Sequence, residues 1–360
     1  MFTVFTGLAV LFFLLVTGLS RAYQAQREAL GNRWFQRGVT DLGAKRYDAA
    51  VTDFRAALLY SRDNYAYQLN LAEALIGVQR TGQASAYLLN LWDREPDDGL
   101  VNLELARIAA QKGQVKQAVR YYHDAVYAAW PDEQETNRRD ARLELIELLL
   151  KNNERAQAES EVIALEANAG DDPRLQARLG DLFIRTLDYE RAFTAYRLSL
   201  KSDRHNPASL SGAGMAAFEL GLYPVAERYL QAALKANSSD SASAERLKTA
   251  ELVLKMDPFE RQLSTQQRNA IVIDDFAVAG ERLTACSTAL GGTSQTTLME
   301  RYATLKPRIT QAGLRHNPDL AETAMDLVFE IEGQTAAKCG SPSAADQALS
   351  LISNLHEGNQ

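Results

Sequence analysis

The residues best suited to metal binding or nucleophilic chemistry are few and scattered in this sequence of 360 residues. No histidine has a second histidine or an acid at ligand spacing on the same expected helix. The four are His123, His205, His316 and His356. The glycine pair at 291–292 lacks the Gly-Lys-Ser/Thr ending of a phosphate loop, and no Gly-x-Ser-x-Gly nucleophile elbow occurs. We therefore expect no catalytic, cofactor-binding or metal-binding residues, no small-molecule substrate and no enzymatic activity.

Cys286 and Cys339 are the only cysteines. Each lies on or beside the apolar stripe of an expected helix, and the two helices need the same interior. A disulfide between them would close a loop of 53 residues and stabilise the fold by about 4 kcal/mol in the chain-entropy estimate. Two buried free thiols are the alternative, and a metal site would need two further ligands.

These groups belong to a chain whose small and large residues recur every 34 residues. The register slips by six residues around 130–133, where we expect a lengthened turn, and then resumes. The first small column holds Gly38, Ala72, Ala106, Ile146, Gly180 and Gly214. The second small column holds Ala50, Ala84, Ala118, Ala158, Ala192 and Ala226, and the large column holds Phe54, Leu88, Tyr122, Val162, Tyr196 and Leu230. Such a period predicts stacked helix–turn–helix units.

The spacing of these columns resembles that of tetratricopeptide repeats (TPRs). In that family, small side chains let two antiparallel helices cross closely, while a large residue of one helix fills the hollow of its neighbour. The resemblance implies an all-α TPR solenoid, an α-α superhelix of about six repeats, within residues 23–240.

The N-terminal segment is strongly apolar, because residues 1–20 carry no charged side chain. Twenty helical residues span about 30 Å, so we expect a transmembrane signal anchor over residues 1–22. The alternative is a secretory signal cleaved after Ala22, although no basic residue precedes Phe2. The helix is expected to continue past Tyr23 toward the first repeat.

Two observations disagree about which side of the membrane the repeats would face. Basic residues follow the apolar segment, and the positive-inside rule then places the repeats in the cytoplasm. They are Arg21, Arg27, Arg33 and Arg37. A disulfide would instead require an oxidising compartment. We expect a single-pass protein of the bacterial inner membrane with periplasmic repeats, and cytoplasmic repeats are the alternative.

After the repeats, residues 241–257 predict a capping helix, because Lys248 occupies the small column and would be costly to bury. Asp257 and Pro258 end the register, and residues 258–360 predict a C-terminal helical bundle. Ser264 and Gln267 form a capping box that begins its first helix.

The TPR resemblance also implies a partner groove, since the first helix of each repeat lines the concave surface at its fifth, ninth and twelfth positions. We name the candidate residues the groove positions: Phe35, Val39, Leu42, Leu69, Glu73, Ile76, Leu103, Arg107, Leu143, Glu147, Leu150, Asp181, Ile184, Met215 and Phe218. They form an apolar strip with charges along its middle, which suits an amphipathic helix or an apolar protein segment. Packing between repeats is the alternative role for some of them. Phe35 and Val39 replace the Lys and Asn with which chaperone-binding TPR domains hold a carboxylate tail.

The formal net charge of −7 argues against nucleic acid as the main partner. Our leading hypothesis is a non-enzymatic, membrane-anchored TPR scaffold that binds protein partners through its groove, in envelope or membrane-complex assembly. The alternative is a stable accessory subunit of a larger membrane protein complex.

Overall fold

The computed structural model describes residues 2–131, 135–286, 289, 292–336 and 338–357. These residues form helices and no strand, so the predicted all-α class is confirmed for them. The chain divides into two compact units, Met1–Leu165 and Glu166–Gln360. The expected boundaries after residues 240 and 257 fall inside the second unit and stay predictions.

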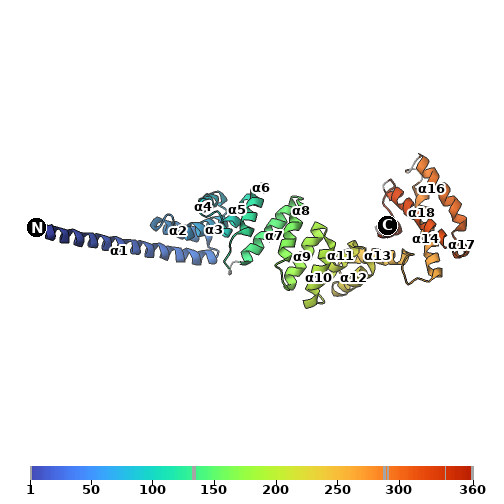
Figure 1. Cartoon of the computed structure of the whole chain (residues 1–360), viewed down its shortest axis with the longest axis horizontal. Coiled ribbons are helices and arrows are strands. Elements are labelled where there is room, and N and C mark those ends of the chain that lie inside the picture. The colour runs from blue at the N-terminus through green and yellow to red at the C-terminus, as the bar shows by residue number, and fades with distance from the viewer. Residues whose placement is uncertain (1, 132–134, 287–288, 290–291, 337, 358–360) are drawn as a thin grey trace. The chain divides into compact units, whose positions relative to one another are not determined.

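In the first unit, neighbouring helices pack against each other in chain order (Figure 1). Its helices are α1 (Phe2–Gly43), α2 (Tyr47–Tyr60), α3 (Tyr65–Gly77), α4 (Thr81–Arg94), α5 (Gly99–Gln111), α6 (Val115–Tyr127), α7 (Glu135–Lys151) and α8 (Arg155–Glu166). The first helices of the expected repeats are α1, α3, α5 and α7.

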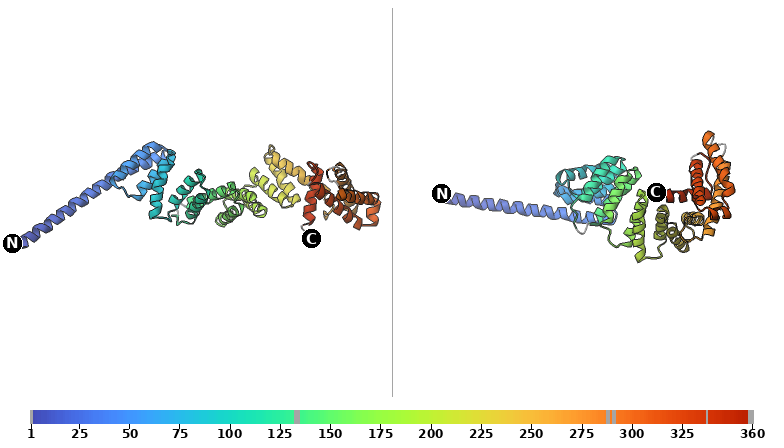
Figure 2. Two further views of the ribbon diagram at one scale, coloured as in Figure 1. Left: turned by 90° about the horizontal axis from the view of Figure 1, so that it is seen from above. Right: turned by 45° about the vertical axis from the view of Figure 1, so that its right-hand side comes forward.

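The second unit contains further helical pairs, followed by the helices of its C-terminal part (Figure 2). Its helices are α9 (Pro173–Thr186), α10 (Tyr189–Ser202), α11 (Pro207–Glu219), α12 (Tyr223–Ala236), α13 (Ser241–Met256), α14 (Thr265–Ala285), α16 (Gly292–Leu305), η2 (Lys306–Arg308), α17 (Gln311–His316), α18 (Asp319–Ala336) and α19 (Ala344–Glu357). The sequence did not predict the short α17.

The predicted membrane anchor is not supported, and the predicted single-pass membrane localisation is wrong. Among the residues that the structure describes, no helix is long and apolar enough to cross a bilayer. The expected continuation of the helix past Tyr23 is confirmed, because α1 runs unbroken to Gly43.

The small and large columns of the repeats meet inside each helical pair. All of their members are buried. Where the small residue is glycine, an added Cβ would approach the large residue 16 positions later. The approach is 2.6 Å for Gly38 to Phe54, 2.7 Å for Gly180 to Tyr196 and 2.7 Å for Gly214 to Leu230. The predicted packing of a large residue over a small one is therefore confirmed at these three crossings.

The turn inside each pair carries a second repeated feature, a residue with positive φ. The turn residues are Lys45 (58°), Gln79 (61°), Gly113 (71°), Asn153 (61°), Leu187 (67°) and Gly221 (72°). They follow the 34-residue register, with the same slip of six residues. Only two are glycines, so the turn geometry is imposed by the packed helices even where the side chain disfavours it.

The lengthened turn at the register slip is anchored by Trp130, which is 8% exposed. Its indole Nε1 donates a hydrogen bond to the carbonyl of Ala125 at 2.7 Å. The ring packs over Gly99, where an added Cβ would collide with it. Residues 132–134 of the expected turn lie outside the described residues.

Several helix starts carry side-chain caps. Asp172 and Asn206 accept backbone hydrogen bonds in front of a first-turn proline. Ser264 and Gln267 form the expected capping box at the start of α14.

One core joins the expected capping helix to the helices that follow it. Ala250 and Val253 of α13 are buried in the same cluster as Phe276 of α14, Leu327 of α18 and Leu349 of α19. Lys248 is exposed, as a capping helix requires. The second unit therefore closes its repeats by sharing apolar surface with the C-terminal helices.

Replacing Gly180 with leucine should lower the free energy of unfolding by about 3 kcal/mol, because the added side chain must displace the buried Tyr196 ring. The matched control is Gly82→Leu on α4, where nothing lies within 4 Å of an added Cβ. That control should leave stability unchanged or raise it by up to about 1 kcal/mol through helix propensity. Chemical denaturation of both variants measures the difference, and equal stabilities would contradict the crossing.

Candidate functional site

The groove positions of the first unit remain mostly accessible. Glu73 and Val39 are exposed, and Val39 is 38% exposed. The apolar side chains that are half-buried are Phe35, Leu42, Leu69, Ile76, Leu143 and Leu150. Partial burial holds each of these side chains in place while leaving apolar area that a partner could cover.

Two groove positions contribute to packing between repeats. The Phe35 ring lies 4.9 Å from the Tyr67 ring and 5.7 Å from the Phe54 ring, measured between centroids. Leu103 is 2% exposed and belongs to the core. Leu103 is thus out of reach of a partner, whereas Phe35 remains half-buried beside its two ring neighbours.

Arg107 of α5 is the centre of a network of charged side chains at the groove positions. Its Nη1 donates to Glu104 Oε1 at 2.5 Å, and its Nη2 donates to Glu144 Oε1 on α7 at 2.6 Å. The Arg107 Nε also donates to Glu144 Oε2 at 3.0 Å, and the Tyr122 hydroxyl donates to that same oxygen at 3.0 Å. The network ties the third repeat to the fourth through one guanidinium.

The network contains more carboxylates than cations. The hydrogen bond to Glu144 raises the pKa of Arg107 above its usual value, so this cation stays charged. Glu73 is exposed as a residue, but neighbouring groups partly desolvate its carboxyl and so raise its pKa, and the charge of Glu104 raises it further. Within the described residues Glu73 makes no hydrogen bond or salt bridge. It therefore presents an unused acceptor between the half-buried Leu69 and Ile76.

The groove positions of the second unit differ in their surroundings. Asp181 is exposed and accepts a hydrogen bond from the Tyr196 hydroxyl at 2.7 Å. Ile184 and Met215 are half-buried. Phe218 packs edge-on against Tyr223, with ring centroids 5.3 Å apart, and contributes to the core of the unit. Phe218 thus serves packing.

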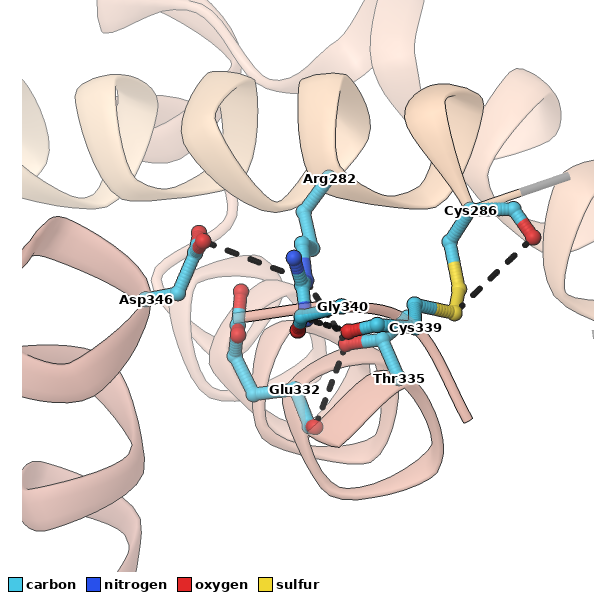
Figure 3. Close-up of a disulfide and its surroundings, with 7 residues drawn as sticks. All are labelled: Arg282, Cys286, Glu332, Thr335, Cys339, Gly340 and Asp346. Atoms are coloured by element: carbon cyan, nitrogen blue, oxygen red, sulfur yellow. Dashed lines mark hydrogen bonds and ion pairs between the residues drawn. A yellow bond between two sulfur atoms is a disulfide. The ribbon is translucent and has the colours of Figure 1, made fainter. Parts of the chain in front are cut away.

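The expected approach of the two cysteines is confirmed. Cys286 ends α14 and Cys339 follows α18, and their Cα atoms lie 5.5 Å apart, within the usual range for a disulfide. Figure 3 shows the pair bonded, with Arg282 and Thr335 beside it. Both cysteines are buried.

Arg282 fixes the backbone next to the cysteine pair. Its Nη2 donates to the carbonyl of Cys339 at 2.7 Å and to that of Gly340 at 3.2 Å, and its Nε lies 3.9 Å from Asp346. Glu332 lies close by (Figure 3), and burial raises the pKa of this carboxyl to about 7. The loop after α18 is thus held by a cation and by the cysteine pair together.

Among the described residues, no three His, Cys, Asp or Glu side chains are placed to hold a metal ion. His123 Nδ1 lies 3.6 Å from Glu161, and His356 Nε2 lies 3.5 Å from Asp257. The expectation that the chain is not an enzyme stays a prediction.

Sequence reasoning missed the partners of Arg107. Glu104 and Glu144 occupy the sixth position of their repeats, next to the fifth position that the TPR resemblance assigned to the groove. Their 40-residue separation is the repeat length at the slip. The acids at this shared repeat position were the sequence signal that could have predicted the ion pairs of Arg107.

Comparisons with known proteins support the repeats. Tetratricopeptide repeat models match residues 41–102 and residues 75–133 and 143–207. The interruption between 133 and 143 coincides with the register slip. Tetratricopeptide repeats are therefore confirmed in this part of the chain. No curated protein matches the chain in sequence.

Solved structures resemble the chain weakly. Pseudomonas aeruginosa pilF is 16% identical, with 61% of this chain and 97% of that chain covered and a TM-score of 0.45. YrrB, described as a TPR protein with an unusual peptide-binding site, is 14% identical over 54% of this chain and 97% of its own, with a TM-score of 0.45. The C-terminal part of a TPR repeat-containing protein from Cytophaga hutchinsonii is 11% identical, with 88% of this chain and 99% of that chain covered and a TM-score of 0.47. These values carry no argument about function.

Arg107→Gln should lower the free energy of unfolding by about 1–2 kcal/mol, because Glu104 and Glu144 lose their shared cation. Adding Glu144→Gln should cost less in this variant than in the wild type, giving a coupling energy of about 1 kcal/mol. Chemical denaturation of the four proteins measures the cycle, with Lys116→Gln on the exposed face of α6 as the control. Strict additivity would refute the network.

Alkylation of denatured protein, quenched directly from cells, should label neither Cys286 nor Cys339 before reduction and both after it, as counted by mass. Reduction should also lower the free energy of unfolding, by up to about 4 kcal/mol for the loop that the bond closes. A variant with Cys286→Ser and Cys339→Ser should be insensitive to the reductant. Two labelled cysteines without reduction would show free thiols instead.

Proposed function

We propose that this chain is a non-enzymatic scaffold that binds protein partners. The basis is the match of tetratricopeptide repeat models to residues 41–133 and 143–207. The TPR fold is generally used for protein–protein interaction. The proposed contact surface is formed by the accessible groove positions of the first unit, on α1, α3 and α7, together with Arg107 of α5.

The observation that carries this proposal is the set of half-buried apolar side chains on first helices of the repeats, on α1, α3 and α7. Leu69 and Ile76 of α3, and Leu143 and Leu150 of α7, are neither fully exposed nor packed away. Such side chains are already ordered, so a partner covers apolar area at a small entropic cost. An amphipathic helix or an apolar segment has the matching chemistry.

The charges at this surface favour a partner segment that carries a basic residue. Three carboxylates, Glu73, Glu104 and Glu144, surround the single guanidinium of Arg107. Glu73 has no hydrogen bond or salt bridge within the described residues and lies in the same helix as Leu69 and Ile76. A lysine or arginine of the partner would satisfy it while neighbouring apolar residues cover the two aliphatic side chains.

The experiment begins with peptide display against the purified full-length chain, followed by synthesis of the enriched peptides. Enriched peptides should combine apolar residues with Lys or Arg. The double substitution Leu69→Asp and Ile76→Asp should reduce their affinity at least about tenfold, because a buried apolar contact becomes an unpaired charge. Glu73→Gln should weaken basic peptides and leave neutral analogues unaffected.

The control is Leu59→Asp on α2, an exposed leucine at 78% that belongs to no groove position. It should bind like the wild type. Circular dichroism melting checks that each variant remains folded. Peptides that bind the Leu69 and Ile76 variant as well as the wild type, or enriched peptides that are acidic, would refute the proposed surface.

A further inference from the structure

A cavity of about 810 Å³ lies in the second unit, along one face of α18. Phe259, which follows α13, and His356 of α19 also line it. The lining residues include no groove position, so an occupant of this cavity is separate from the partner proposed for the first unit.

The wall that α18 contributes is a single stripe of the helix. Glu322, Asp326, Phe329, Glu330 and Gly333 follow one another at steps of three or four residues or lie side by side, which places them on one helical face. The buried side chains of α18 lie on the opposite face. Both Glu322 and Asp326 are exposed. The acidic side chains of this stripe therefore stand on the side of α18 where the cavity lies.

The carboxylates of the wall outnumber its cations. Glu330 forms an ion pair with Arg301 of α16 at 2.5 Å. Glu322 and Asp326 form no ion pair and no side-chain hydrogen bond within the described part of the chain, and no lysine or arginine is among the described residues that line the cavity. Two carboxylates one helical turn apart are thus left for a cation from outside the chain.

Phe259 and Phe329 give the cavity an aromatic wall. Their ring centroids lie 6.4 Å apart, and the Phe259 ring lies 4.3 Å from the ring of His356. Both phenylalanines are half-buried and pack against the core of the unit. The backbone N–H of Phe259 donates to Asp257 Oδ1 at 2.9 Å, which holds the segment after α13 in place. The rings are therefore ordered before a partner arrives, which lowers the entropic cost of binding.

We propose that this cavity binds an arginine side chain of a basic protein segment. The guanidinium would donate hydrogen bonds to the carboxylates of Glu322 and Asp326, and its flat face would lie against the Phe329 ring. A guanidinium suits this wall because it pairs with carboxylates through several N–H groups and also stacks on aromatic rings.

Other occupants match the wall less well. No three His, Cys, Asp or Glu side chains among the described residues are placed to hold a metal ion. A lysine ammonium would match the charge, but it is a compact, strongly hydrated group that has no flat face to stack on a ring. An apolar segment would take Glu322 and Asp326 out of water without pairing them, which is costly.

The test uses the peptide acetyl-Gly-Arg-Gly-Arg-Gly-amide as the probe and isothermal titration calorimetry on the full-length protein at low ionic strength. The peptide with citrulline at both arginine positions is the ligand control, because citrulline has nearly the shape of arginine without its charge. The arginine peptide should bind saturably. The citrulline peptide should bind at least about tenfold more weakly, and the lysine peptide at least about threefold more weakly, since it cannot stack.

The double substitution Glu322→Gln and Asp326→Asn should weaken the arginine peptide at least about fivefold and leave the citrulline peptide unchanged. The matched control is Glu251→Gln with Glu281→Gln, which removes the same charge from exposed positions that do not line the cavity. That control should change the affinity less than about twofold. Circular dichroism melting checks that both variants remain folded.

Gly333→Leu tests the cavity itself without changing any charge. Nothing lies within 4 Å of a Cβ added at this exposed helical glycine, so the leucine should occupy part of the cavity, melt no lower than the wild type and weaken the arginine peptide at least about threefold. Gly82→Leu, the same change at an open position of α4, should bind like the wild type.

Four results would overturn the proposal. They are absence of saturable binding, equal affinity for the citrulline or lysine peptide, full affinity in the folded Glu322 and Asp326 variant, and full affinity in folded Gly333→Leu.

Discussion

The close crossing of two helices inside each repeat is the constraint on which the rest of this structure depends. At Gly38, Gly180 and Gly214 a single added carbon would collide with the large residue 16 positions later. That approach sets the angle and depth of the pair, and the turn between the helices must follow. Leu187 and Gln79 consequently adopt a positive φ that their side chains disfavour. Packing therefore outweighs local backbone preference here, since burying one large side chain stabilises the fold by more free energy than one strained turn residue costs.

The acids near Arg107 and two acids of the second unit have different surroundings. In the first unit, acids near the groove positions share Arg107, and the pairs remain partly open to water. In the second unit, Asp275 and Glu332 are buried, and each has an oxygen without a hydrogen-bond partner among the described residues. Their pKa values rise to about 8 and about 7, chiefly because burial disfavours the ionised carboxylate.

The cysteine pair and Arg282 hold the chain between α18 and α19 in place. The chain between α18 and α19 has little regular structure to hold it, and its carbonyls at Cys339 and Gly340 would otherwise lack partners. A guanidinium satisfies both carbonyls, while the cysteines tie the end of α14 to the end of α18. One core then runs from the α13 side chains Ala250 and Val253 into these helices. The repeats are thereby closed by shared apolar surface as well as by the polar outer face of α13.

By itself, the sequence determined the helical class, the repeat register and the cap at Ser264. Each of these follows from local propensity or from a period that one-dimensional spacing records. The approach of Cys286 to Cys339 was one of three alternatives until the structure placed the ends of their helices together. Only the tertiary structure decided which groove positions a partner can reach. Leu69 and Leu103 both occupy the fifth position of their repeats, yet only Leu103 is buried. Burial depends on neighbours distant in the chain, as do the ion pairs of Arg107 and the missing partner of Asp275. Apolar composition alone suggested a membrane helix at the N-terminus, but no helix among the described residues is long and apolar enough to cross a bilayer.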